Sequence, residues 1–222
     1  MCGRYNIVTD AEALVDAFDI LVNEFGENQP GAARYNIPPT STVPIVREHG
    51  QRRTLSPAYW GLLPHWAKDK KLAFKTFNAR SETITEKASF RSPIKKSRCI
   101  IPATGWFEWR KEGDVKQPYY FDTGGLIPFA GVSAWHPEFE MLSCSIITTA
   151  SNPAVSRIHH RMPVILEKDR IDGWVSPETD MPQVLSLLKP YEGDDLVITR
   201  VSTKVNSTRY NDPDCIEGVR VN

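Results

Sequence analysis

Short apolar and β-branched runs, separated by turn residues, dominate this chain and limit its fold more than any other feature. Such runs predict strands, and the polar turns between them predict hairpins. The strands expected in chain order are residues 43–46, 54–60, 98–101, 105–109, 118–121, 126–135, 141–149 and 196–201. Pro102 is expected to separate the strand at residues 98–101 from the strand at residues 105–109. Strands do not alternate with long helices and no glycine-rich phosphate loop occurs, so a nucleotide-binding α/β fold is disfavoured.

A few short helices are expected to interrupt these strands. Residues 9–12 (TDAE) form a capping box before a helix near 10–20, and Asp180 caps a helix that ends near Lys189. Residues 81–89 are weakly helical, and residues 23–42, rich in Gly, Pro and Asn, predict an ordered loop. A chain of 222 residues is ample for one sizeable core, so we expect a single α+β, β-rich domain over residues 1–222.

Charge and cysteine usage exclude several classes of protein. The 27 basic and 27 acidic residues give a net charge of zero, so a nucleic-acid binder would need a local basic patch. The four cysteines form no CxxC pair and no cluster at metal-ligand spacing, which predicts free thiols in a reducing compartment and no metal site. The chain shows no signal sequence and no apolar run of about 18 residues, so we expect a cytoplasmic protein without a membrane span.

The second residue carries the first candidate chemistry. Removal of Met1 exposes Cys2 with an α-amine and a thiol on adjacent carbons. Such a 1,2-aminothiol condenses with an aldehyde to an imine, and the thiol then closes a five-membered thiazolidine ring. The amine and thiol ordinarily titrate at about 8 and 8.5, so both are partly competent near neutrality. The alternative is that Cys2 is simply a small second residue.

Glu108 is a candidate general acid. It lies in GWFEW at 105–109, where strand alternation puts Trp106 and Glu108 on one face and Phe107 and Trp109 on the other. A carboxylate in an apolar pocket has a raised pKa and can donate a proton near neutrality. The equally weighted alternative is an exposed glutamate at a strand edge, paired with a neighbouring cation.

Two further motifs supply polar groups. IHHRMP at 158–163 places two histidines and an arginine before an apolar strand, where a histidine can shuttle protons, although a surface turn explains the motif as well. In an extended segment the two rings would point in opposite directions, so at most one would face a site. Asn78, Arg80 and Glu82 share a face if that segment is extended, and Ser81 is alternatively a helix cap.

The ordered set of these motifs resembles the SOS response-associated peptidase (SRAP) family. The blocks are MCGR at 1–4, RYNIPP at 34–39, WGL at 60–62, NARSET at 78–83, GWFEW at 105–109 and IHHRMP at 158–163. Residues 205–211 resemble the C-terminal segment of the family, so the likeness covers nearly the whole chain. The resemblance implies an antiparallel, barrel-like (bifurcated) sheet surrounded by a few short helices.

The resemblance also implies covalent capture of abasic sites in single-stranded DNA as a thiazolidine on the N-terminal cysteine, in the DNA damage response. The implied catalytic residues are Cys2, Asn78, Glu108 and His159. The implied DNA contacts are Arg4, Arg80 and Arg161 on phosphates, with Trp66 and Pro39 as an apolar wedge. No metal or organic cofactor is implied. The expected partner is single-stranded DNA containing abasic sites, and the expected protein is a cytoplasmic monomer, associated with the nucleoid if bacterial.

Two other functions stay open on the sequence. Cys2 could serve as the nucleophile of an N-terminal-nucleophile peptidase, or the chain could bind single-stranded DNA without forming a bond. Self-processing and an ordinary methionine aminopeptidase could each remove Met1, because Cys2 is small.

Overall fold

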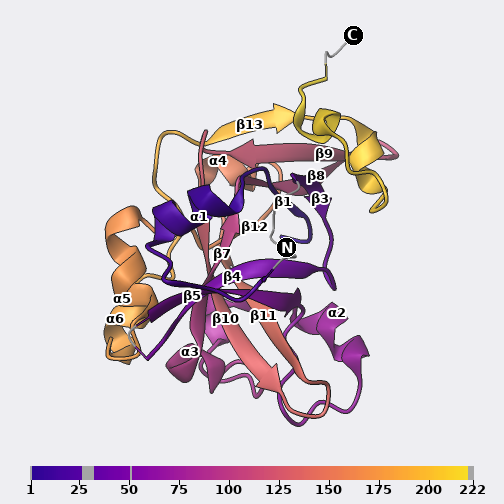
Figure 1. Ribbon diagram of the computed structural model, residues 1–222. Helices are drawn as coiled ribbons and strands as arrows, with labels where there is room; N and C mark the ends of the chain where they lie inside the picture. The colour runs from indigo at the N-terminus through magenta and orange to yellow at the C-terminus, as the bar shows by residue number, and fades with distance from the viewer. Residues whose placement is uncertain (1, 27–32, 51, 220–222) are drawn as a thin grey trace.

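The computed structural model describes residues 2–26, 33–50 and 52–219 (Figure 1). The strands are β1 (Tyr5–Ile7), β2 (Val22–Asn23), β3 (Arg34–Ile37), β4 (Thr42–His49), β5 (Arg52–Trp60), β6 (Asn78–Arg80), β7 (Arg98–Ala103), β8 (Gly105–Glu112), β9 (Val115–Asp122), β10 (Ile127–His136), β11 (Met141–Ala150), β12 (Arg161–Pro163) and β13 (Val197–Arg200). The helices are α1 (Ala11–Phe18), α2 (Ala73–Thr76), α3 (Pro93–Lys96), α4 (Pro153–Ser156), α5 (Ile171–Val175) and α6 (Met181–Ser186). Single 3₁₀ turns are η1 (Lys70–Leu72), η2 (Ser81–Thr83), η3 (Lys168–Arg170), η4 (Thr203–Asn206) and η5 (Pro213–Ile216).

Five strands close into a barrel. β11 pairs with β10, β10 with β7, β7 with β4 and β4 with β5, all antiparallel, and a short parallel pairing of β5 with β11 completes the ring. β6 and β12 add to β11, and β2 adds to β5. A Cβ at Gly131 of β10 would lie 2.9 Å from the terminal Cδ1 of Ile101 on β7, so the barrel wall is closely packed at this position.

The remaining strands form a second, five-stranded antiparallel sheet in the order β13-β9-β8-β1-β3. It lies across the top of the view in Figure 1, with the barrel below it and α1, α5 and α6 on the left. The two sheets share one core: Trp106 of β8 stacks on Phe121 of β9 at 4.9 Å and meets Phe129 of the barrel edge-on at 5.9 Å. Burial of such large rings fixes the sheets against one another.

This architecture confirms the expected α+β, β-rich fold with a barrel-like sheet and short helices. The hairpin across residues 47–53 and the two long strands β10 and β11 are also present. Among the described residues, none of the helices is both long and apolar enough to cross a membrane.

Three local predictions were wrong. The N-cap of α1 is Asp10, whose side chain accepts the Ala13 N–H, rather than Thr9 of the capping box. The expected loop 23–42 contains β3, because pairing with β1 holds residues 34–37 extended although Gly, Pro and Asn are frequent around them. Residues 27–32 of the expected loop lie outside the described part. Pro102 does not break β7. β4 pairs only with Cys99 and Ile100 of β7, so the side of β7 that faces β4 is not paired with it at Pro102, where the proline has no N–H to donate.

The weakly helical segment 81–89 and the shared face of residues 78, 80 and 82 were only partly right. Asn78 and Arg80 lie two apart in β6, but the chain turns into η2 at Ser81. Glu82 therefore belongs to a 3₁₀ turn rather than to the strand.

Candidate active site

A cavity of about 610 Å³ opens where β1 separates from β8. β1 pairs with β8 only up to Trp106, and the last bond runs from the Phe107 N–H to the Arg4 carbonyl. Beyond that point the edge of β8 faces the cavity. The lining residues are Gly3, Arg4, Phe77, Glu108, Trp109, Lys116, His159 and Asn206.

Cys2 lies beside this cavity, and its side chain is fully buried. Its carbonyl oxygen accepts a hydrogen bond of 2.8 Å from Asn78 Nδ2, so β6 holds the start of the chain in place. Burial raises the pKa of the Cys2 thiol well above its ordinary value, and the nearby Glu108 carboxylate raises it further. The thiol is therefore protonated at neutral pH and needs a base to react.

Glu108 is a buried carboxyl group, with only 2% of its surface exposed. Trp106 belongs to the main core while Phe107 packs in a second cluster with Trp109, as the expected alternation requires of these three residues. Glu108 and Trp109 nevertheless both line the cavity. The burial of Glu108 excludes the alternative of an exposed glutamate at a strand edge. Burial raises the pKa of Glu108 to about 7, which lets it exchange a proton near neutrality.

His159 approaches Glu108, with Nδ1 lying 3.8 Å from Oε2. Nδ1 also lies 3.0 Å from the Arg161 backbone nitrogen and 3.2 Å from the Arg161 carbonyl oxygen, so the backbone of Arg161 holds the ring in place. Burial lowers the pKa of His159 to about 4. At pH 7 the ring is therefore neutral, and its contact with Glu108 is not an ion pair.

The two histidines do not point in opposite directions, as an extended segment would require. The His159 and His160 rings stack with centroids 4.5 Å apart, because the chain bends between α4 and β12. Only His159 lines the cavity.

Two of the three candidate arginines are buried and engaged by the protein. Arg4 Nη1 donates to Asn36 Oδ1 at 2.7 Å and to the Val205 carbonyl at 2.9 Å. Arg161 holds the Glu82 carboxylate with both terminal nitrogens, at 2.5 and 3.0 Å, and donates to the Thr148 carbonyl as well. Arg80 is exposed at the end of β6.

The candidate wedge residues lie outside the cavity lining. Trp66 is 48% exposed on the loop after β5, and Pro39 is half-buried between β3 and β4. The structure thus places Glu108 and His159 in the lining of one cavity, with Cys2 and Asn78 joined to each other beside it, whereas Trp66, Pro39 and Arg80 are not among its lining residues.

Sequence reasoning missed the wall formed by Trp109, Lys116 and Asn206. Trp109 Nε1 donates to Asn206 Oδ1 at 2.6 Å, and the Lys116 ammonium lies 5.2 Å from the centre of the indole ring. Strict alternation along β8 would have placed Trp109 on the face opposite Glu108, so it did not indicate that both line one cavity. Lys116 and Asn206 carry no local signal, because β9 and η4 reach this wall only through tertiary packing.

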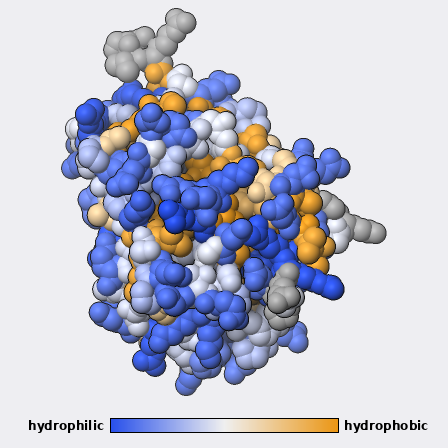
Figure 2. Space-filling model, turned by 90° about the vertical axis from the view of Figure 1, so that its left-hand side faces the viewer, coloured by the Kyte–Doolittle hydropathy of each residue, from blue (hydrophilic) through white to orange (hydrophobic). Residues whose placement is uncertain are grey.

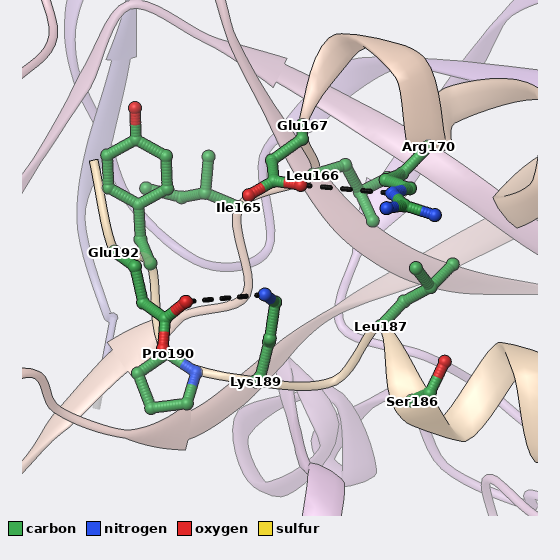
Figure 3. Close-up of a pocket in the computed structure, with 10 residues that line it drawn as sticks. Ile165, Leu166, Glu167, Arg170, Ser186, Leu187, Lys189, Pro190 and Glu192 are labelled. Atoms are coloured by element: carbon green, nitrogen blue, oxygen red, sulfur yellow. Dashed lines mark hydrogen bonds and ion pairs between the residues drawn. The ribbon is translucent and has the colours of Figure 1, made fainter.

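A second hollow of the described structure differs in its chemistry. The pocket in Figure 3 contains Glu167 paired with Arg170 at 3.8 Å and Lys189 paired with Glu192 at 3.4 Å, so its charges satisfy one another. Figure 2 shows the left-hand face of Figure 1, where polar atoms cover most of the surface and apolar atoms are exposed between them. Within the described ranges, no three His, Cys, Asp or Glu side chains are grouped to hold a metal ion.

Fold and site together define a class: a β-barrel protein with a second packed sheet, a buried cysteine at position 2, and a neighbouring glutamate and histidine that line one cavity. The sequence profile of the SOS response associated peptidase (SRAP) family matches residues 1–208. The chain belongs to this family.

Characterised relatives and a solved structure extend the comparison. The chain is 39% identical to the abasic site processing protein YoaM of Bacillus subtilis, over 98% of each chain. It is 33% identical to the abasic site processing protein HMCES of Gallus gallus, over 97% of this chain and 77% of that protein. A crystal structure of a protein from Bacteroides thetaiotaomicron superposes with a TM-score of 0.86 at 29% identity, covering 99% of this chain and 100% of the other.

Proposed function

We propose that this protein captures abasic sites in single-stranded DNA by forming a thiazolidine on Cys2 after Met1 is removed. The observation that carries the proposal is the placement of Cys2, held by Asn78, beside a buried Glu108 with a pKa of about 7 and an open cavity. The names of the relatives, abasic site processing proteins, support the substrate. The protein would act on DNA in the cytoplasm as a monomer.

The proposed reaction balances without a cofactor. The Cys2 α-amine adds to the aldehyde of the ring-opened sugar, and loss of one water gives an imine. The thiol sulfur then adds to the imine carbon, while its proton ends on the nitrogen. One carbon–nitrogen and one carbon–sulfur bond form, and the net product is protein plus DNA minus one water.

Glu108 would act as both acid and base in this sequence. Its protonated form would donate to the departing hydroxyl of the carbinolamine. The resulting carboxylate would then accept the proton of the Cys2 thiol, whose raised pKa requires a base. A pKa of about 7 makes both forms available at neutral pH.

His159 would assist opening of the sugar ring. Its pKa of about 4 keeps the imidazole neutral at pH 7, so it can accept a proton. Arg80, Trp66 and Pro39 would contact the flanking strand, and Arg4 and Arg161 would contribute positive charge beneath it.

The geometry favours capture over a peptidase that acts on other proteins. Such a peptidase needs a thiolate, which a protonated imidazole beside it stabilises. Here burial raises the pKa of the Cys2 thiol and lowers that of His159, so neither group is in the form required. Removal of Met1, by the protein itself or by an aminopeptidase, precedes the capture in either case.

The test is denaturing mass spectrometry of protein confirmed to lack Met1, incubated with a single-stranded oligonucleotide that carries one abasic site. The expected adduct has the mass of both partners minus one water. An oligonucleotide whose abasic sugar is reduced, and so has no aldehyde, is the matched control, and Cys2→Ser is the matched variant. A missing adduct with the abasic strand, or an equal adduct with Cys2→Ser, would contradict the proposal.

A further inference from the structure

One wall of the cavity holds two cations against a single indole ring. The Arg4 guanidinium lies 5.7 Å and the Lys116 ammonium lies 5.2 Å from the centre of the Trp109 ring. Both distances allow cation–π attraction, which acts within about 6 Å of an aromatic ring. Asn206 Oδ1 accepts the Trp109 indole N–H at 2.6 Å, which fixes the orientation of the ring. Arg4, Trp109 and Lys116 are here called the cationic wall.

Carboxylates do not neutralise the cationic wall. Arg4 donates to the Asn36 amide oxygen and to the Val205 carbonyl, which are neutral acceptors. Lys116 contacts the indole, and no acid among the described residues forms an ion pair with it. Glu108 is the only acid among the described lining residues, and its pKa of about 7 leaves it partly neutral at pH 7. The cavity is therefore positive in a chain whose net charge is zero.

The cationic wall acts on the same space as the reacting groups. Lys116 and Glu108 both line the cavity, from the paired strands β9 and β8 of the upper sheet in Figure 1. Burial raises the pKa of Glu108 and the charge of Lys116 acts in the opposite direction, so the field of the lysine extends to the carboxyl group. An anion held by Lys116 would thus lie in the cavity beside which Cys2 is placed.

The cavity has the size of a small-molecule site. Its volume of about 610 Å³ falls within the range of about 300–1,000 Å³ that is typical of such sites. Phe77 and Trp109 supply apolar surface, while Lys116 and Asn206 supply polar groups. The reacting groups recognise an aldehyde and the cationic wall recognises an anion. Neither of these two features requires that the anion belong to a nucleic acid.

We propose that the cavity also takes small free aldehydes that carry a phosphate group, with Lys116 selecting the phosphate while Cys2 captures the aldehyde. This inference rests on the aldehyde capture of the proposed function and extends it to substrates outside DNA. The carbonyl carbon gains one bond to nitrogen and one to sulfur. Its oxygen leaves as water, with one hydrogen from the Cys2 amine and one from the thiol. Small phosphorylated aldehydes would then compete with the abasic strand for Cys2.

The test compares glyceraldehyde 3-phosphate with glyceraldehyde, which lacks the phosphate, by following adduct formation with intact-protein mass spectrometry. The protein is confirmed to lack Met1, and Cys2→Ser gives the background of adducts on other amines. Each rate constant is divided by that of cysteine methyl ester with the same aldehyde, which removes differences in reactivity between the two aldehydes. The normalised rate constant should be about 5–10 times larger for the phosphorylated aldehyde, because the ammonium attracts the phosphate.

Lys116 variants assign this preference to one side chain. Lys116→Gln should reduce the ratio of the two normalised rate constants to about 1, whereas Lys116→Arg keeps the charge and should retain the ratio. Glyceraldehyde reports any change in the proton exchange of Glu108, so the ratio isolates the effect of the phosphate. Lys111→Gln is the matched control and should keep the wild-type ratio. Lys111 is exposed and pairs with Lys116 across β8 and β9, but it does not line the cavity.

A wild-type ratio of about 1, or an unchanged ratio in Lys116→Gln, would overturn the inference even if abasic strands still crosslink. An equal loss in Lys111→Gln would also overturn it, because the preference would then come from the general field of the sheet. Capture of glyceraldehyde 3-phosphate without capture of the abasic strand would count against the proposed function alone. Failure to capture either aldehyde or the strand would overturn both.

Discussion

Glu108 shows how one carboxyl group obtains its chemistry from its surroundings. Its neighbours on β8 bury it between the two sheets, and the resulting desolvation raises its pKa to about 7. Replacement by an amide of the same shape removes the proton exchange and leaves the packing. We expect Glu108→Gln to slow capture of abasic DNA by about 10²–10⁴-fold in single-turnover assays. Equal capture rates for this variant and the wild type would remove Glu108 from the mechanism.

The same residue predicts a pH dependence of stability. Between its ordinary pKa of 4.5 and its folded pKa of about 7, the folded state holds a proton that the unfolded state has released. The stabilisation is complete below pH 4.5 and is lost as pH rises through 7. The free energy of unfolding of Glu108→Gln should therefore gain about 3 kcal/mol relative to the wild type between pH 4 and pH 8. Urea titrations between pH 4 and pH 8 measure the difference in free energy of unfolding between Glu108→Gln and the wild type. A difference that does not change with pH would contradict the raised pKa of Glu108.

At the scale of elements, one ion pair ties η2 to β12. Both terminal nitrogens of Arg161 are held by Glu82, which is the position that a phosphate would occupy. Glu82→Gln removes the competing charge, while the Thr148 carbonyl still holds the guanidinium. Undamaged single-stranded DNA should then bind more tightly, with a salt slope steeper by about 0.7. Weaker binding by Glu82→Gln would show that the carboxylate serves to orient Arg161.

The close approach of the end of β5 to α2 depends on a single glycine. Gly61 has φ of +144°, and a Cβ there would lie 2.5 Å from the Cβ of Ala73. Gly61→Ala should lower the free energy of unfolding by about 2–4 kcal/mol, because it adds backbone strain to a steric clash. The control is Gly125→Ala, where nothing lies within 4 Å and a change below about 0.5 kcal/mol is expected. Urea unfolding measures the free energy of unfolding of both variants. Equal losses of stability in Gly61→Ala and Gly125→Ala would refute the close contact between Gly61 and Ala73.

Local patterns predicted most elements but not their boundaries. Alternation in GWFEW correctly separated Trp106 from Phe107 and Trp109, since that pattern is set by the strand itself. β3 was missed because its pairing partner β1 is distant in sequence. The stacked rings of His159 and His160 were missed because the bend before β12 is imposed by tertiary packing.

At the scale of the molecule, the fold protects all four thiols. The side chains of Cys2, Cys99 and Cys144 are fully buried, and Cys215 is 1% exposed. Burial raises the pKa of each thiol. Protein that retains Met1 should therefore resist alkylation by iodoacetamide at pH 8, and urea should expose four reactive thiols. Rapid labelling of the native protein, read by mass spectrometry, would contradict this protection.

The sequence by itself determined the class of fold and the chemical groups available to the site. Strand patterning depends on neighbours in the chain, and the motifs from MCGR to IHHRMP carry the amine, thiol, carboxylate and imidazole. Only the tertiary structure decided what those groups can do. The raised pKa of Glu108, the neutral state of His159 and the wall of Trp109 and Lys116 arise where separate strands meet. Desolvation and proximity depend on packing between distant segments, which no local pattern encodes.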